Sequence, residues 1–159
     1  MKTEIKQIYI DDLKPALDLV NKVFTEFVAV DYSEQGKATF ATYLENKYEE
    51  VSLDISSGNK KLWGYYNDGV IVGVIGTRDN THISLMFVDK AYHRQGIATQ
   101  LFNKVISDLI IDPDNKEITV NSSPYAVIVY EHLGFAKTAE QQERDGILFI
   151  PMRYLIYGG

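Results

Sequence analysis

A short polar loop between an apolar segment and a helical pattern carries the residues best suited to chemistry. Residues 93–98 read HRQGIA and follow the apolar stretch 83–88. The first N–H groups of a helix lack partners within it, and the helix dipole makes that end partly positive. Gly96 and Ala98 leave room for an anion at the main chain, and Arg94 adds positive charge. This pattern is typical of a phosphate-binding loop, and also of a plain strand–turn–helix connection.

The loop is neither G-x-x-x-x-G-K-[ST] nor G-x-G-x-x-G, so a P-loop or a dinucleotide-binding fingerprint is disfavoured. A longer stretch is more informative. Phe-Val-Asp at 87–89, followed by an [Arg/Gln]-x-x-Gly-x-[Gly/Ala] pattern, resembles the acetyl-CoA signature of the GNAT superfamily of N-acyltransferases. Gly96 and Ala98 match the two small positions, whereas His93 stands where the family usually has Gln or Arg.

A second match lies downstream in the order that the family has it. Residues 123–135 read SPYAVIVYEHLGF and resemble the family segment N-x-x-A-x-x-x-Tyr-Glu-x-x-Gly-Phe, with Ser123 replacing the common Asn. The resemblance covers at least residues 81–135. It implies an α/β fold of the GNAT type, with a mixed β-sheet of about seven strands, splayed at the motif strand and flanked by about four helices.

The hydrophobic periodicity predicts the elements that must position these residues. Apolar alternation predicts strands at 3–10, 61–66, 70–77, 81–88, 118–121, 135–142 and 147–156. Three- and four-residue spacing predicts helices from Asp11 or Asp12, from Ser33, over 95–111 and over 124–133. Asp68-Gly69 between two strand patterns predicts a hairpin turn. The C-terminal strand 147–157, if it lies unpaired at the sheet edge, would allow a homodimer.

The resemblance implies how the donor is held. The pantetheine arm is expected to lie in the splay like an added strand, bonded by main-chain groups at Met86, Phe87 and Val88. The side chains of these three residues fit plain core packing equally well. The pyrophosphate is expected on the N–H groups of Arg94, Gln95, Gly96, Ile97, Ala98 and Thr99. Ser123 fits a hydrogen bond to the cofactor or a helix N-cap, and the cap is favoured.

The resemblance also places two catalytic candidates. Tyr130 matches the family tyrosine near the CoA sulfur, and a phenol with an ordinary pKa of about 10 is protonated at neutral pH and can donate. His82, near the start of the motif strand, is the candidate general base, because an imidazole accepts a proton near neutrality. Both residues also fit structural roles. Glu26, Asp31 and Glu34 compete as bases, because the segment between the first two helices often lines the family's acceptor site.

Composition limits the remaining possibilities. The 159 residues are 45% hydrophobic and 24% charged, which predicts a single domain over 1–159. The net charge of −6 argues against nucleic acid and anionic membranes as partners. There are no cysteines, and the three histidines are far apart in sequence, so no metal is expected. Without a membrane-spanning run or a signal core, the expected location is cytoplasmic.

These observations favour an N-acetyltransferase that moves an acetyl group from acetyl-CoA to a primary amine of a small molecule or peptide, by direct attack in a ternary complex. Two alternatives remain at this point: a non-catalytic acyl-CoA-binding regulatory module, and a nucleotide-binding or interaction protein that only mimics the motif. An aromatic wall over the acceptor is expected from side chains that also fit a core stripe, namely Phe24, Phe27, Tyr32, Phe40 and Tyr43.

Overall fold

The computed structural model describes residues 2–28 and 32–156, and the side chains of 27, 28 and 43–47 lie outside that description. The strands are β1 (Thr3–Ile8), β2 (Lys60–Asn67), β3 (Val70–Arg78), β4 (His82–Val88), β5 (Glu117–Ser122), β6 (Ala136–Lys137), β7 (Gln142–Arg144) and β8 (Ile147–Leu155). The helices are α1 (Leu13–Val23), α2 (Glu34–Ser57), α3 (Ile97–Leu109) and α4 (Val127–Leu133).

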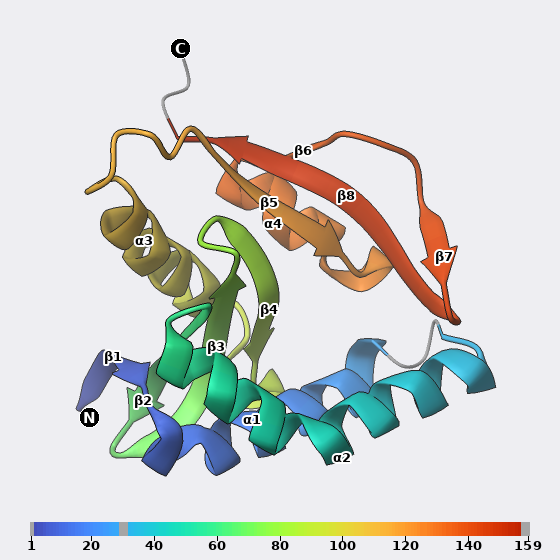
Figure 1. Cartoon of the computed structure of the whole chain (residues 1–159), viewed down its shortest axis with the longest axis horizontal. Helices are drawn as coiled ribbons and strands as arrows, with labels where there is room; N and C mark the ends of the chain where they lie inside the picture. The colour runs from blue at the N-terminus through green and yellow to red at the C-terminus, as the bar shows by residue number, and fades with distance from the viewer. Residues whose placement is uncertain (1, 29–31, 157–159) are drawn as a thin grey trace.

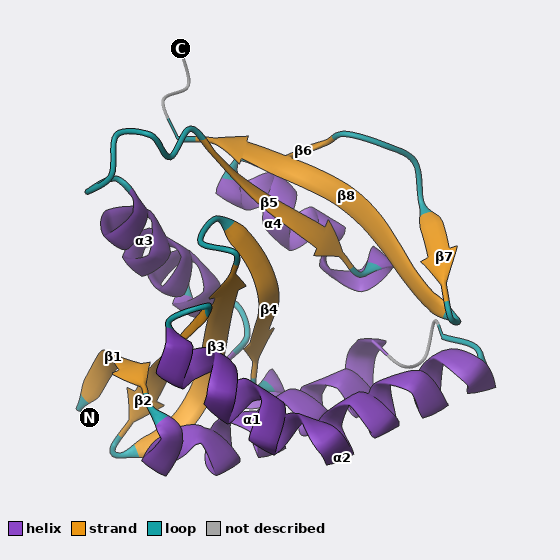
Figure 2. Cartoon of the chain, viewed as in Figure 1, coloured by secondary structure: helices purple, strands orange, loops and turns teal. Residues whose placement is uncertain are grey.

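The strands form one mixed sheet in the order β1-β2-β3-β4-β5-β8-β6, with β7 pairing β8 beside that path. Figure 1 shows α1 and α2 on one side of the β2–β4 part of the sheet and α3 on the other. In Figure 2, β1–β4 form one half of the sheet and β5–β8 form the other. The two halves meet only at one end. The observed architecture is the splayed mixed sheet that the sequence predicted.

The helices form where the sequence places caps and apolar stripes. In α1, Leu13, Ala16, Val20 and Val23 recur on one buried face. The hydroxyl of Ser33 accepts a hydrogen bond from the Gly36 N–H at 3.1 Å and so caps α2, as predicted. A π-helical turn follows α1 and ends its regular helix earlier than the apolar pattern alone indicates.

Each face of the sheet has its own core. Trp63 and Ile75 pack with α3 and α4 residues such as Leu101 on one face. Leu62 and Val74 pack with α1 and α2 on the other face. The two cores are separated by the sheet, so a passage between β4 and β5 would connect the two sides of the molecule.

A β-bulge at Ser84 sets the direction of the motif strand. The β3–β4 register shifts by one residue there. Without the extra residue, Ile83 and Leu85 would share a face. Instead Ile83 and Met86 pack on the α3 side, whereas Leu85 and Phe87 pack on the α1 side. The bulge therefore bends β4 away from its neighbour just beyond the last paired residue.

β4 and β5 are parallel and pair at two positions only, His82 with Thr119 and Ile83 with Val120. Beyond Ile83 the two strands diverge (Figure 1). Because backbone polar groups in a protein interior are nearly always paired, an open strand edge inside a cavity marks a place for another chain-like group. The splay expected at the motif strand is confirmed.

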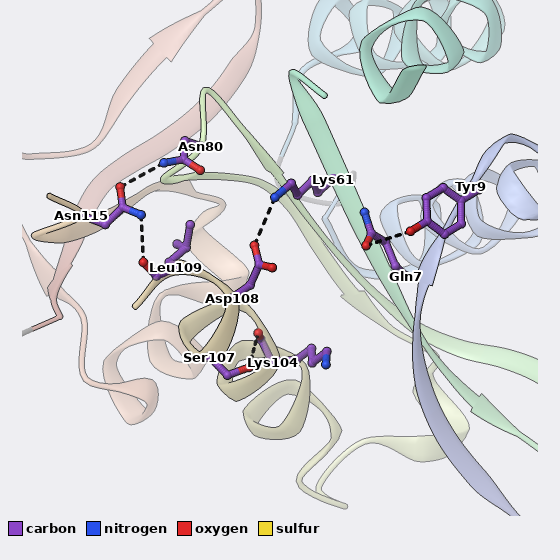
Figure 3. Close-up of polar contacts among 9 residues, drawn as sticks. All are labelled: Gln7, Tyr9, Lys61, Asn80, Lys104, Ser107, Asp108, Leu109 and Asn115. Atoms are coloured by element: carbon purple, nitrogen blue, oxygen red, sulfur yellow. Dashed lines mark hydrogen bonds and ion pairs between the residues drawn. The ribbon is translucent and has the colours of Figure 1, made fainter. Parts of the chain in front are cut away.

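A polar cluster holds the closed end of the splay (Figure 3). The side chain of Asn115 accepts from Asn80 at 3.0 Å and donates to the Leu109 carbonyl at 2.9 Å. These bonds tie the turn before β4 to the end of α3 and the start of β5. Nearby, Lys61 pairs with Asp108 at 3.3 Å and fastens α3 to β2 (Figure 3). The divergence therefore starts from a fixed point.

The predicted strand 135–142 is wrong as a continuous element. It is two short strands, β6 and β7, which pair with different parts of β8. The carbonyl of Pro151 accepts from the Thr138 N–H at 2.9 Å, so the ring nitrogen of Pro151 faces the same neighbour. Because proline has no N–H, the ladder cannot continue there.

The predicted edge position of the C-terminal strand is also wrong. β8 pairs with β5 on one side from Ile150 to Leu155, and with β6 and β7 on the other. β8 is an interior strand, because β6 and β7, which follow α4 in the chain, both pair with it. The argument for a homodimer through this strand is therefore removed. Tyr157 lies outside the described residues.

Candidate active site

One cavity of about 1060 Å³ passes through the sheet where β4 and β5 diverge. Met86, Ile97 and Tyr130 line it on the α3 side, and Phe24 and Phe40 line it on the α1 side. Two molecules could therefore enter from opposite faces and meet at the splay. Eleven of the twelve residues predicted for the site line this cavity, and the exception is Gln95.

The loop before α3 is open to solvent and fixed at both ends. Gly96 is the residue before the first turn of α3 and has a φ of 76°, and a Cβ added to it would meet nothing within 4 Å. Arg94 also has a positive φ, of 64°. The two left-handed residues turn the chain so that the N–H groups from residue 96 onward point out of the helix. The main chain there can be approached by an anion.

The side chain of His93 stabilises the loop before α3. Its Nε2 lies 2.8 Å from the Val88 carbonyl, so the ring joins the loop to the end of β4. Asp89 accepts from the Ala91 N–H at 3.0 Å and pairs with Lys22 of α1 at 3.0 Å. These two contacts, in that order, hold the pKa of Asp89 below its usual value. The contact between His93 and the Val88 carbonyl gives a local reason for a histidine at position 93, where the family usually has Gln or Arg.

The free edge of β4 is defined by its pairing with β3. The Asp89 N–H donates to the Val72 carbonyl at 2.8 Å, on the β3 side. Alternate residues of a strand direct their main-chain groups to opposite neighbours. Phe87 therefore faces β3, and the main-chain groups of Met86 and Val88 face the gap. The main-chain contact predicted for Phe87 is therefore not available, because its main chain faces β3. The side chain of Phe87 lines the cavity.

Tyr130 lies on α4 and lines the cavity while its ring is almost wholly buried, at 4% exposure. The ring meets Phe135 edge-on at 5.3 Å between centroids, and this contact fixes its orientation. Burial raises the pKa of Tyr130 well above its ordinary value of 10.0. The phenol therefore keeps its proton across the physiological range, which is the state that a general acid requires.

His82 lines the same cavity at the closed end of the splay. Its Nδ1 lies 2.8 Å from the hydroxyl oxygen of Thr119 on β5. Burial is the main cause that lowers the pKa of His82 below 6.5; the charge of Arg78 adds to the effect and that of Asp79 opposes it. The imidazole is therefore neutral at pH 7. In the tautomer whose Nδ1–H donates to the Thr119 hydroxyl, Nε2 is the nitrogen that can accept a proton.

The competing bases are less well placed. Glu26 and Glu34 are exposed, and neither lines the cavity. Asp31 lies outside the described residues. Ser123 caps a 3-10 turn, Pro124–Ala126, by accepting from the Ala126 N–H at 3.2 Å, so the predicted cap is confirmed. Ser123 also lines the cavity.

The face toward α1 carries aromatic side chains. Phe24 and Phe40 stack with centroids 3.7 Å apart, and Tyr32 meets Phe24 edge-on at 5.2 Å. All three line the cavity, whereas the side chains of Phe27 and Tyr43 lie outside the described part. The sequence analysis missed Arg144 of β7, which lines the same region. No local signal marks it, because its position depends on how the β7–β8 hairpin folds back.

Among residues 2–28 and 32–156, no helix is both long enough and apolar enough to cross a membrane. The same residues contain no group of three or more His, Asp or Glu side chains arranged to bind a metal ion.

The splayed sheet, the open helix N-terminus beside it and a tyrosine at their junction define a class of acyl-transfer folds. Residues 28–156 match the family described as an acetyltransferase (GNAT) domain. The chain therefore belongs to the GNAT acetyltransferase family, and it is an acyltransferase by class. No curated protein sequence matches it significantly.

Solved structures agree on the fold. The chain is similar to a PaiA N-acetyltransferase from Thermoplasma acidophilum in complex with coenzyme A, with a TM-score of 0.78 and 17% identity, covering 98% of this chain and 99% of that one. It is similar to a GNAT acetyltransferase from Staphylococcus aureus Mu50, with a TM-score of 0.74, 17% identity and coverages of 98% and 99%. It is also similar to a GNAT acetyltransferase from Streptococcus pneumoniae, with a TM-score of 0.70 and 18% identity, covering 97% of this chain and 99% of that one.

Proposed function

We propose that the protein transfers an acetyl group from acetyl-CoA to a primary amine in a ternary complex. The observation that carries this proposal is the cavity through the sheet. It contains the free edge of β4, the open N-terminus of α3, Tyr130 and His82. A donor on one face and an acceptor on the other would meet between the two titratable side chains.

The donor side fits coenzyme A in two respects. The main-chain groups of Met86 and the N–H of Val88 face the gap and can bond the amides of a pantetheine arm as a neighbouring strand would, whereas the Val88 carbonyl is engaged by His93. The open space at Gly96 leaves the N–H groups at the start of α3 accessible to a pyrophosphate, with Arg94 adding charge. The solved relative from Thermoplasma acidophilum, which has the same fold, is a complex with coenzyme A.

The reaction needs one proton removed and one supplied. The bound thioester supplies an electrophilic carbonyl carbon. The amine nitrogen bonds to that carbon, the carbon–sulfur bond breaks, and its electron pair leaves with sulfur. His82 accepts the proton of the amine, directly or through water, and Tyr130 gives its proton to the departing sulfur. The opposite pKa shifts of the two side chains suit these roles, since one stays neutral and the other stays protonated at pH 7.

The first test is calorimetric titration with acetyl-CoA, followed by thiol release with a panel of amines. We expect micromolar binding and amine-dependent thiol release. Tight binding without release for any amine would favour the alternative, a non-catalytic acyl-CoA-binding regulatory module. Absence of acetyl-CoA binding would overturn the proposal.

A further inference from the structure

The cavity has a charge opposite to that of the protein. The chain carries a net charge of −6, yet none of the described residues that line the cavity is Asp or Glu. The cationic lining residues are Lys60, Arg78, Arg94 and Arg144. An amine alone would gain nothing from such a lining, since like charges repel. The lining therefore favours a molecule that carries a negative group.

These cations differ in what they already contact. Lys60 pairs with Asp54 at 3.7 Å, and Arg78 lies 4.0 Å from Asp79. Arg94 belongs to the loop on the donor side. Arg144 has no carboxylate within ion-pair distance in residues 2–28 and 32–156, and its guanidinium stands over the Phe149 ring at 5.7 Å from the centroid. Arg144 is thus the cation whose charge is available on the acceptor side.

The β7–β8 hairpin holds Arg144 at this position. The Thr39 hydroxyl of α2 shares its proton between the Asp145 carbonyl at 2.9 Å and the Gln35 carbonyl at 2.8 Å, and the Tyr32 hydroxyl donates to the Leu148 carbonyl at 3.3 Å. Both contacts fix the end of the hairpin against the start of α2 (Figure 1). A guanidinium on a fixed strand presents a planar pair of donors that matches a carboxylate.

The surroundings of Arg144 indicate the rest of the acceptor. Phe24, Phe40 and Tyr32 line the same side, and Ile147, three residues after Arg144, packs on that cluster. Apolar lining with one charged group is the usual composition of a small-molecule site. An acceptor with an apolar body and one anionic group fits both features.

We propose that the acceptor is a primary amine that also carries an apolar body and a carboxylate, and that Arg144 binds this carboxylate. This inference rests on the proposed acetyl transfer, with the amine directed to the splay and the carboxylate held at its outer end. Arg144 is a specificity-determining residue in this assignment and takes no part in the proton transfers.

The test compares acceptors that differ only at the carboxylate. Thiol release from acetyl-CoA is measured with leucine, leucinamide and 3-methylbutylamine, and with phenylalanine, phenylalaninamide and phenethylamine. A third arm uses 6-aminohexanoate, which separates the amine from the carboxylate. We expect kcat/KM to be about 10- to 100-fold higher for the carboxylates than for the matching amides, because a charge-assisted pair is lost in the amides.

Arg144→Gln should remove this preference by lowering kcat/KM for the carboxylates alone, and Arg144→Lys should restore part of it. Arg153→Gln is the matched control, because Arg153 lies on the neighbouring strand, pairs with Glu117 at 3.9 Å and does not line the cavity. Its preference should equal that of the unaltered protein. A preference for the carboxylates that Arg144→Gln leaves intact would overturn the assignment of Arg144.

The failure of this inference is distinguishable from that of the proposed function. Equal or faster turnover of amides and simple amines would overturn the inference and leave acetyl transfer intact. No turnover with any carboxylate-bearing amine would overturn it as well, and acetyl-CoA titration of the same sample would then show whether donor binding survives.

Discussion

Gly36 of α2 and Gly146 of the β7–β8 turn meet main chain to main chain. A Cβ on Gly36 would collide with the Gly146 carbonyl, and a Cβ on Gly146 would collide with the Gly36 backbone. Gly146 also has a φ of 81°, where L side chains are strained. This contact allows the hairpin to dock on α2 and so places Arg144 and Ile147 in the lining of the cavity.

Gly36→Ala is expected to undock the hairpin. In an open helix the change would stabilise, since alanine is the better helix former. Here overpacking should destabilise the protein by about 1–3 kcal/mol, and the acceptor KM should rise while acetyl-CoA affinity is kept. Chemical denaturation and steady-state kinetics measure both. Gln35→Ala, on an exposed neighbour, should change neither; a stable Gly36→Ala protein with normal kinetics would contradict the docking argument.

Tyr130→Phe is expected to lower kcat by about 100-fold or more, the usual range for losing a general acid. Phenylalanine keeps the edge-on contact with Phe135, so stability and acetyl-CoA binding should stay close to those of the unaltered protein. Single-turnover kinetics and calorimetry separate the effects. Full turnover on the preferred amine would exclude the role.

The lowered pKa of His82 leads us to expect a fall in rate on the acid side of the pH–rate profile. Its pKa is lowered from 6.5, so the imidazole becomes protonated only below that pH. The rate should therefore be independent of this group at pH 7 and fall as the pH drops through the lowered pKa. His82→Gln should lower kcat and remove that limb. A limb that persists unchanged in His82→Gln would point to another base.

The same shift affects stability with a defined sign. A histidine whose pKa is lower in the folded state than in the unfolded state favours folding above the unfolded value of about 6.5. That contribution is lost as the pH falls through the folded pKa of His82. Denaturation at pH 7 and pH 5 should show a smaller loss in His82→Gln than in the unaltered protein.

Gly96→Glu is expected to abolish acetyl-CoA binding, because a carboxylate at the start of α3 would repel the pyrophosphate. Gly69→Glu is the matched control. Gly69 has a φ of 83°, and a Cβ added to it also meets nothing within 4 Å, but it lies in the β2–β3 turn and does not line the cavity. Both variants should share the backbone strain, about 1–2 kcal/mol. Equal binding by the two would exclude this loop as the phosphate site.

The sequence by itself determined the elements whose signals are local. Ser33 caps α2 because its side chain bonds a group three residues away. Asp68 and Gly69 form the turn that joins β2 to β3, because two adjacent residues are enough to specify a hairpin turn. The segments 87–98 and 123–135 indicated the family for the same reason, since each motif is continuous in the chain.

Tertiary structure alone decided the features that depend on distant segments. The bulge at Ser84 and the divergence of β4 from β5 arise from pairing between strands far apart in sequence. Pro151 divides the predicted strand 135–142, because its missing N–H faces that segment only once the two lie side by side. Arg144 reaches the cavity only because two glycines let the hairpin meet α2. Side-chain periodicity records which face a residue takes, and it contains no information on which strand will become its neighbour.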